Sequence, residues 1–216
     1  MITIERAKYP RTLHLPWSIS FDEDKVLEST TQFVGAHVIV TEKMDGENTT
    51  LTSTYMHARS LDSRINVTRH WVKALHAQIK NAIPENWRIV GENVHFKHAI
   101  YYEKLPSFFL VFAIFDENDD VLSWDETVNV CSALGLQHVP VLYEGLWNEQ
   151  NIKDCYTGTS KFGDEQEGYV VRVADSFPSE LFSLKVAKFV RPYHIAGNLH
   201  WTKHIYSHNQ LARIEV

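Results

Sequence analysis

Short apolar runs alternate with polar turns along most of this chain. Residues 37–41 and 49–54 flank an Asp-Gly turn signal at 45–46, and this pattern predicts a hairpin with Lys43 at its bend. Further strand-like runs, rich in valine, isoleucine and phenylalanine, cover residues 87–94, 108–115, 168–173 and 184–190. These runs predict a fold in which antiparallel strands dominate.

Helical periodicity is confined to three segments between these strands. Thr68 is expected to cap a helix that continues to about Asn81, because Trp71, Leu75 and Ile79 recur every four residues. Two further helices are expected over residues 125–134 and 148–155. The order of elements indicates an α+β fold rather than a βαβ alternation.

Composition bounds the number of domains and the setting of the protein. With 216 residues, 44% of them hydrophobic, and without a repeat or linker, residues 1–216 are expected to form a single domain. Cys131 and Cys155 lack the spacing of a disulfide framework or a thiolate metal site, which is typical of a reducing compartment. No leader-like or membrane-spanning apolar stretch is present, so we expect a soluble, cytoplasmic protein without a membrane partner.

Charge is distributed unevenly although the net charge is only −6. Residues 181–214 contain no Asp or Glu, and the tail over about 192–216 is basic and rich in histidine. We interpret this part as a surface that faces a polyanion, with simple solvation of its cations as the alternative. A metal site at His200 and His204 is rejected because no third ligand accompanies them. The tail also contributes Lys203, Arg213, His194, His208, Trp201 and Tyr206, an aromatic and cationic mixture typical of nucleic-acid surfaces.

Lys43 is the candidate for covalent chemistry, because it stands at the end of an apolar strand in the sequence Lys43-Met-Asp-Gly46. A free lysine amine titrates near about 10.4, so nucleophilic attack near neutral pH requires surroundings that lower this pKa. A lysine before an Asp-Gly turn is also common in surface hairpins. Other residues along the chain must therefore decide whether Lys43 is a nucleophile or an ordinary surface lysine.

Those residues occur in a recognisable order: Arg59 in Ala-Arg-Ser, Glu92 in Gly-Glu-Asn, Phe112 in Phe-Ala-Ile, Glu167 and Arg172 in Glu-Gly-Tyr-Val-Val-Arg, then Lys185 and Lys188 in Leu-Lys-Val-Ala-Lys. The series resembles the covalent nucleotidyltransferases, the superfamily of polynucleotide ligases and capping enzymes, over about residues 36–191. Glu42 to Asn48 is most similar to the first motif of RNA ligases of the phage double-strand-repair type. Ala113 replaces the aspartate usual in the third motif, and Phe115-Asp116 is a competing register.

The resemblance implies a fold, a reaction and a cofactor. The fold would be an antiparallel-sheet-rich nucleotidyltransferase (ATP-grasp-like, adenylyltransferase) domain of polynucleotide ligases, without an OB-fold domain. Lys43 would attack the α-phosphorus of ATP, with Mg²⁺ or Mn²⁺ present, to form lysyl-AMP and pyrophosphate. Lys188, or alternatively Lys185, would neutralise the phosphates and depress the pKa of Lys43. The two cannot both point straight into one site from a strand without a bulge, because positions three apart face opposite sides. The resemblance places such lysines two apart.

The remaining motif residues receive roles by the same resemblance. Glu167 and Glu92 would hold the metal, with Glu92 alternatively near the sugar, and Phe112 would stack on adenine. Glu42 belongs to the nucleotide site, Asp45 and Asn48 would orient the sugar and the acceptor hydroxyl, Arg59 would contact the ribose and the strand end, and Arg172 would bind a terminal phosphate.

The leading hypothesis is an ATP-dependent RNA ligase that seals 5′-phosphate to 3′-hydroxyl ends, with nicked or paired RNA or RNA/DNA as partner. We expect a monomer, with a protein partner as one source of strand specificity. A minimal DNA ligase and a GTP-dependent capping-type transferase are the alternatives within enzymes. A non-catalytic nucleic-acid-binding module that keeps the fold is the alternative of another class.

Overall fold

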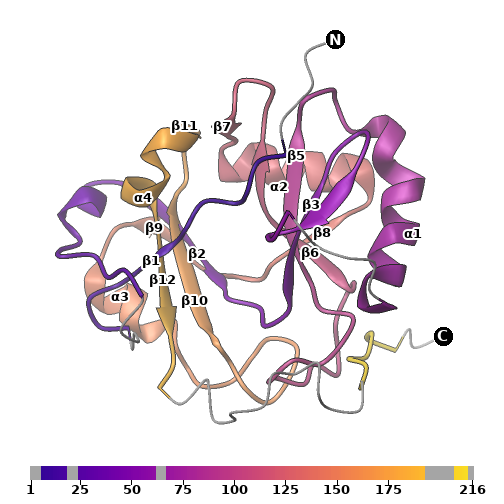
Figure 1. Cartoon of the computed structure of the whole chain (residues 1–216). Coiled ribbons are helices and arrows are strands. Elements are labelled where there is room, and N and C mark those ends of the chain that lie inside the picture. Colours follow the sequence, from indigo (N-terminus) through magenta and orange to yellow (C-terminus); the bar gives the residue numbers. More distant parts are fainter. Residues whose placement is uncertain (1–5, 19–23, 62–66, 193–206, 214–216) are drawn as a thin grey trace.

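Two β-sheets face each other in the computed structural model, which describes residues 6–18, 24–61, 67–192 and 207–213 (Figure 1). Sheet A has five strands in the order β1-β12-β10-β2-β9. Its strands are β1 (Leu13–His14), β12 (Val186–Val190), β10 (Gly168–Val173), β2 (His37–Glu42) and β9 (Val141–Leu146). All pairs are antiparallel except β1 with β12. The strands of sheet A therefore come from both ends of the sequence.

Sheet B has seven strands, six of them in the order β11-β7-β6-β5-β3-β4, with β8 paired in parallel to β6. Its strands are β11 (Phe177–Pro178), β7 (Asp120–Val121), β6 (Phe109–Phe115), β5 (Arg88–Asn93), β3 (Glu47–Leu51), β4 (Met56–Ala58) and β8 (Gln137–His138). The predicted strands at 87–94, 108–115 and 168–173 are confirmed to within one residue at each end. The mixed, sheet-rich α+β architecture is confirmed as well.

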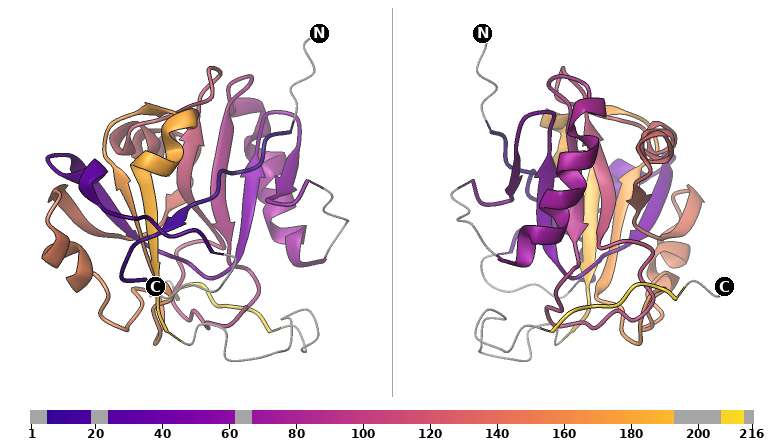
Figure 2. Two further views of the ribbon diagram at one scale, coloured as in Figure 1. Left: turned by 60° about the vertical axis from the view of Figure 1, so that its left-hand side comes forward. Right: turned by 90° about the vertical axis from the view of Figure 1, so that its right-hand side faces the viewer.

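Helices cover the outer face of sheet B and one flank of sheet A (Figures 1 and 2). They are α1 (His70–Ile79), α2 (Trp124–Leu134), α3 (Glu149–Asp154) and α4 (Phe182–Lys185), with 3₁₀ turns at Thr31–Phe33, Val67–Arg69, Lys80–Ala82 and Ser179–Leu181. Val72 of α1 and Cys131 of α2 share a buried cluster with Ile89 and Ile114 of sheet B. The second helix begins and ends sharply, because Ser123 and Glu126 form a capping box and Gly135 adopts the left-handed conformation.

Apolar side chains from both sheets meet in the space between them. Val40 and Val171 of sheet A share one buried cluster with Ala113 and Phe115 of sheet B. A second cluster, which contains Met44, Tyr102 and Leu110, lies beneath the segment that joins β2 to β3. Burial of apolar area of this kind is the main force that holds the two sheets together.

The segment Lys43–Gly46 carries the chain from sheet A to sheet B, so the predicted hairpin is wrong. Strand β2 pairs with β9 and β10, whereas β3 pairs with β4 and β5. An Asp-Gly turn signal is local and does not reveal whether the strands on either side pair with each other. Gly46 is required by close packing here, because a Cβ atom on it would lie 2.5 Å from the carbonyl oxygen of Asn93.

Two further boundaries differ from the sequence-based expectation. Thr68 lies within a 3₁₀ turn rather than capping a helix, and α1 begins at His70 and ends at Ile79. Lys185 is the last residue of α4, so the strand expected over 184–190 begins only at Val186. Among the described residues, no helix is long and apolar enough to cross a membrane.

Candidate active site

A cavity of about 380 Å³ opens between the two sheets and brings together side chains that are far apart in the sequence. Sheet A contributes the end of β2 with β10 and β12, and sheet B contributes β3, β5, β6 and β7. Eight of the predicted site residues line it: Glu42, Lys43, Asn48, Arg59, Glu92, Phe112, Arg172 and Lys188. The other three, Asp45, Glu167 and Lys185, do not line its wall.

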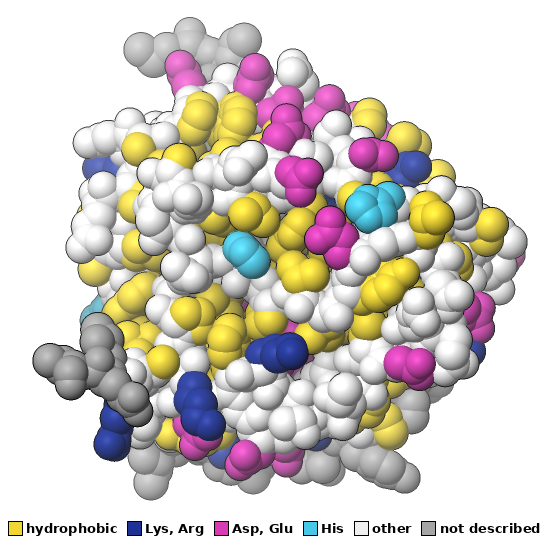
Figure 3. Space-filling view, turned by 180° about the vertical axis from the view of Figure 1, so that it is seen from behind, with side chains coloured by type: hydrophobic (Ala, Val, Ile, Leu, Met, Phe, Trp, Pro, Cys, Tyr) yellow, Lys and Arg dark blue, Asp and Glu magenta, His cyan; other side chains and the backbone are white. Residues whose placement is uncertain are grey.

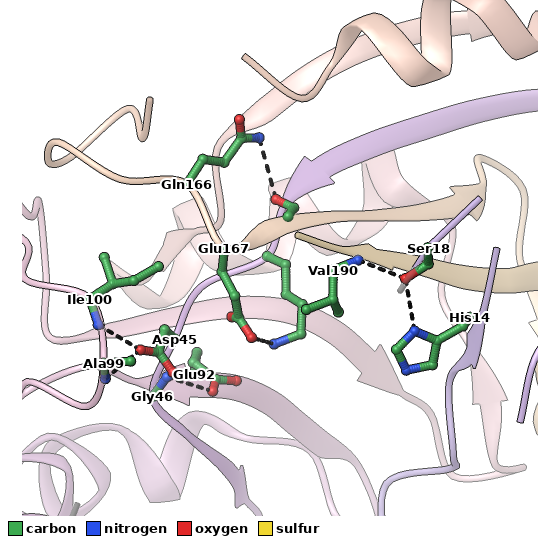
Figure 4. Close-up of polar contacts among 12 residues, drawn as sticks. His14, Ser18, Asp45, Gly46, Glu92, Ala99, Ile100, Gln166, Glu167 and Val190 are labelled. Carbon is green, nitrogen blue, oxygen red and sulfur yellow. Dashed lines mark hydrogen bonds and ion pairs between the residues drawn. The ribbon is translucent and has the colours of Figure 1, made fainter. Parts of the chain in front are cut away.

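Lys43 is held where the chain leaves sheet A. Its backbone N–H donates to the carbonyl of Gly168 at 3.0 Å, which ties it to the start of β10. Its Nζ atom donates to Oε1 of Glu167 at 2.6 Å, and the side chains are 25% and 4% exposed respectively. Glu167 does not line the cavity itself, and its carboxylate is linked to the cavity by its hydrogen bond to Nζ of Lys43 (Figure 4).

The carboxylates around Lys43 determine its protonation state. Burial alone would lower the pKa of Lys43, but the charges of Glu167, Glu92 and Asp45 outweigh burial and raise it. The expectation that neighbouring cations lower this pKa is therefore wrong, because the carboxylates outweigh them. The amine is held as an ammonium ion until the surrounding negative charge is compensated.

Glu92 faces Lys43 from strand β5 of the opposite sheet. Its Oε1 atom accepts the backbone N–H of Gly46 at 3.1 Å, which links the crossing segment to sheet B (Figure 4). Burial raises the pKa of Glu92 to about 8, with the charges of Glu167 and Asp45 adding to the effect and Lys43 opposing it. This carboxyl group consequently titrates close to neutral pH.

Asp45 uses its carboxylate inside the protein rather than in the cavity. Its Oδ2 atom accepts the backbone N–H groups of Ala99 and Ile100, both at 2.8 Å, and its own N–H donates to the hydroxyl of Tyr102 at 2.9 Å. Charge-assisted bonds to two amides fix the crossing segment against the loop before β6. The structure thus gives Asp45 a positioning role, and its predicted contact with the sugar stays a prediction.

Lys188, rather than Lys185, is the second lysine of the cavity. Val186 and Lys188 are two residues apart on β12, so they share one face of the strand and both line the cavity wall. Lys185 lies at the end of α4 instead. Burial lowers the pKa of Lys188, and repulsion by Lys43 lowers it further. The position two residues before Lys188, where the resemblance places a second lysine, carries an apolar side chain.

Two polar atoms of the cavity wall are buried without a hydrogen-bond partner among the described residues. They are Oδ1 of Asn48, on β3, and Oε1 of Glu42, whose other oxygen accepts the backbone N–H of Lys161 at 2.9 Å. Burial raises the pKa of Glu42. Because buried polar atoms are almost always paired, these two oxygens stand out as acceptors with capacity for a further hydrogen bond.

Phe112 presents part of its ring to the cavity from β6, where predicted stacking on a base would take place. The ring of Tyr9 packs against it edge-on, with centroids 5.1 Å apart at 73°. Tyr9 belongs to a segment, residues 6–12, that runs across the opening between the sheets before β1 joins sheet A (Figures 1 and 2). An apolar floor for a flat ring is thus built from both sheets and this segment.

The two predicted arginines differ in how free their side chains are. Arg59 is exposed at the cavity mouth, and its backbone N–H donates to the carbonyl of Asn48 at 3.0 Å. Arg172 is 4% exposed and donates to the carbonyls of Val173 and Leu122, at 3.1 and 2.5 Å. Burial lowers the pKa of Arg172 to about 10. Arg172 is committed to joining the sheets, which leaves Arg59 the better placed of the two for an incoming phosphate.

Sequence reasoning missed the residues that come from the N-terminal part of the chain. Tyr9, Pro10, Arg11, Thr12 and Asp24 all line the cavity. They belong to no motif, and their single charged or aromatic side chains give no periodic signal. The polyanion-facing tail expected over 192–216 lies outside the described residues at 193–206 and 214–216, while residues 207–213 pack against the loop before β6.

The donor set fits a divalent cation that is shared with a ligand. Within the described part of the chain, no group of three or more His, Cys, Asp or Glu side chains could hold a metal alone. Glu92 and Glu167 nevertheless supply hard carboxylate oxygens on either side of Lys43. Magnesium-type ions are commonly held by one or two carboxylates together with substrate phosphates. On the face seen in Figure 3, acidic side chains gather near the top, whereas lysine and arginine side chains are scattered, several of them in the lower part.

A cavity between two facing sheets, with a lysine at the point where the chain crosses between them, is the site of a nucleotidyltransferase-type domain. Solved structures of an RNA ligase from Naegleria gruberi share this fold. One with pyrophosphate matches at a TM-score of 0.59 and 21% identity, over 74% of this chain and 51% of that one. A point mutant with ATP and Mn matches at 0.59 and 19%, with the same coverage. Another with ATP and Mn matches at 0.56 and 16%, over 81% and 54%.

The chain belongs to the RNA ligase family, whose sequence profile matches residues 36–190. That range includes every predicted site residue from Glu42 to Lys188. No curated protein sequence matches the chain. The chain spans about half the length of the solved ligases that it resembles.

The charge balance of the cavity predicts how Glu92 responds to the loss of Lys43. In Lys43→Met the pKa of Glu92 should rise above its value of about 8, because the cation that opposes burial is removed. A ¹³C NMR titration of the glutamate carboxyl groups measures this shift. Lys185→Met is the matched control and should leave the titration unchanged. A Glu92 that titrates near about 4.3, the ordinary value, would contradict the electrostatic description.

Proposed function

We propose that this chain is the nucleotidyltransferase domain of an ATP-dependent RNA ligase that works through a lysyl-AMP intermediate. The observation that carries the proposal is Lys43, whose amine is fixed at the cavity by Glu167 and lies within electrostatic reach of Glu92 and Lys188. Membership of the RNA ligase family supports it. Solved structures of the Naegleria gruberi ligase contain ATP or AMP, in each case with Mn.

The first step would join AMP to Lys43. Nζ first releases its ammonium proton, and the lone pair of the neutral amine attacks the α-phosphorus of ATP. A P–N bond forms, nitrogen releases a second proton to solvent, and the bond from the α-phosphorus to the bridging oxygen breaks. Pyrophosphate leaves with that electron pair. Lys188 would offset negative charge that develops on the phosphates, while Arg59 at the cavity mouth would hold the outer groups. Catalysis by positioning and charge compensation suits a reaction at phosphorus.

A divalent cation would be held at Glu92 and Glu167 together with the nucleotide. The phosphates of ATP would otherwise approach two carboxylates, and a divalent cation held there would offset this repulsion. When bound, the cation supplies charge neutralisation of the phosphates and competes with the Lys43 proton for the same carboxylates. Mg²⁺ and Mn²⁺ both suit such oxygen donors.

Two features favour adenine among the bases. Phe112 and Tyr9 provide an aromatic surface for a flat ring. The buried Oε1 atom of Glu42 can accept a hydrogen bond from an exocyclic amino group, such as the 6-amino group of adenine. Guanine carries a carbonyl oxygen at that position, so a GTP-dependent capping-type transferase fits this wall less well.

Two later steps would complete the joining of strands. An oxygen of a 5′-phosphate attacks the α-phosphorus, the P–N bond breaks and Lys43 leaves with a proton. A 3′-hydroxyl then attacks the activated 5′-phosphate and expels AMP. The substrates would be RNA or RNA/DNA ends, with a repair role of the phage type, and a protein partner could supply strand specificity to a monomer. Sealing assays on matched RNA, DNA and hybrid nicks separate this proposal from a minimal DNA ligase.

A reducing cytoplasm is the setting that suits the two cysteines. Both are buried and free. Burial raises the pKa of Cys131 to about 12 and that of Cys155 to about 11, which makes their thiols poor nucleophiles.

Covalent labelling tests the proposal. With α-labelled ATP and Mg²⁺ or Mn²⁺, the wild-type chain should become labelled in denaturing electrophoresis, and GTP should label it less. Lys43→Arg should abolish labelling. Lys188→Ala should slow it on the order of a hundredfold, as for the loss of one charge-stabilising group, whereas Lys185→Ala should stay close to the wild-type rate. If neither ATP nor GTP labels the wild type, the non-catalytic nucleic-acid-binding alternative is favoured.

The pH dependence of labelling follows from the Lys43–Glu167 pair. Protonated Lys43 cannot attack, so a raised pKa places the acid limb of the pH–rate profile at higher pH. Glu167→Gln removes the charge that raises the pKa of Lys43 most, so burial lowers that pKa and the acid limb moves to lower pH. The maximal rate should fall as well, since a metal donor is lost. Glu165→Gln, at an exposed carboxylate paired with Arg191, is the control. A limb that stays in place in Glu167→Gln would refute the assigned role of the pair.

A further inference from the structure

Residues 207–213, the C-terminal clip, are bound to the loop of residues 94–105 that precedes β6. Lys97 N–H donates to the carbonyl of Ser207 at 2.9 Å, and Leu105 exchanges backbone bonds with Gln210 and Ala212, at 3.0 and 2.8 Å. In both views of Figure 2 the clip, in yellow, runs beside this loop. The last described segment of the chain is therefore tied to the domain by backbone hydrogen bonds, with Asn209 as its buried residue.

Asn209 is the residue through which the clip reaches the interior. It is 2% exposed, and its backbone N–H donates to the carbonyl of His95 at 3.1 Å. Its Oδ1 atom accepts the N–H of Tyr102 at 2.9 Å, and its Nδ2 atom donates to the carbonyl of Val94 at 2.8 Å. One side chain thus joins the two ends of a turn, Val94 and Tyr102, which are both fully buried.

The same turn holds the crossing segment on its other side. The hydroxyl of Tyr102 accepts the N–H of Asp45, while the N–H groups of Ala99 and Ile100 donate to the Asp45 carboxylate. Tyr102 is fully buried. Its backbone N–H donates to Asn209, and its hydroxyl accepts the N–H of Asp45, which lies two residues after Lys43. Asn209 and the crossing segment are consequently linked by a short chain of hydrogen bonds.

We propose that Asn209 is a positioning residue for Lys43, which acts through Tyr102 and Asp45 and contacts no ligand. This inference rests on the proposed lysine nucleophile. Without the Asn209 side chain, the buried N–H of Tyr102 and carbonyl of Val94 lose their partners, and the turn must move to satisfy them. Movement of the turn shifts Asp45, and with it the direction in which Lys43 presents its amine to the cavity.

Single-turnover labelling with ATP tests this role in the full-length chain. Asn209→Ala should slow formation of the lysyl-AMP bond by on the order of ten- to a hundredfold, the cost of a small misplacement of a reacting group. The apparent affinity for ATP should change little, because Asn209 does not line the cavity. Gln210→Ala is the matched control, since Gln210 is exposed and its recorded bonds are made by its backbone.

Tyr102→Phe keeps the ring and removes only the hydroxyl that accepts the Asp45 N–H. It should slow the same step, and the double variant with Asn209→Ala should be less than additive, because both lie on one path. All rates are measured below the melting temperature of each variant. A folded Asn209→Ala with a wild-type rate, or effects of the two substitutions that simply add, would overturn the proposal.

Amide hydrogen exchange provides a readout that does not depend on ligase activity. Asn209→Ala should increase exchange in the peptide that contains Asp45 and Gly46, and Gln210→Ala should not. If the wild type fails to bind AMP covalently but this exchange pattern is present, the proposed function fails while the structural link stands. If exchange at Asp45 is unchanged in Asn209→Ala, the link itself is refuted.

Discussion

The carboxylate of Asp45 holds the segment in which the chain leaves one sheet and enters the other. Two amides of the loop before β6 donate to it, and Glu92 holds the next residue, Gly46, from sheet B. Because Lys43 begins this segment, its amine is positioned by both sheets at once. A lysine in a two-residue hairpin turn would have been exposed and mobile. The crossing gives Lys43 a fixed direction and a partly buried position, which a nucleophile requires.

The charges around the cavity keep the amine of Lys43 protonated. Glu167, Glu92 and Asp45 favour the protonated lysine, although burial opposes them. On the proposed function, a nucleotide with a divalent cation would bring positive charge to those carboxylates, so binding of the cation and loss of the lysine proton would be thermodynamically linked. Val186 is apolar, which leaves Lys188 as the lysine of β12 that lines the cavity. The proposed ligand would therefore complete the chemistry of the site.

Much of the fold and most of the site could be predicted from sequence, and the failures have physical causes. Strands with continuous apolar runs, such as β6, and the capped helix α2 are determined by local pattern. The hairpin failed because pairing is a long-range property that Asp-Gly does not encode. The choice between Lys185 and Lys188 needed the helix-to-strand boundary. Asn209 could not be found, because an isolated asparagine in a basic tail resembles a solvated one until its partners are known.

The two carboxylates near Lys43 belong to different sheets. Glu92 lies in β5 of sheet B, and Glu167 immediately precedes β10 of sheet A. Their separation is set by the apolar clusters between the sheets, in which Val40 and Val171 meet Ala113 and Phe115. A looser core would widen the gap between the carboxylates and alter the protonation of Lys43 without any change in the site itself. We therefore expect substitutions in this core to change the reactivity of Lys43 as well as the stability of the fold.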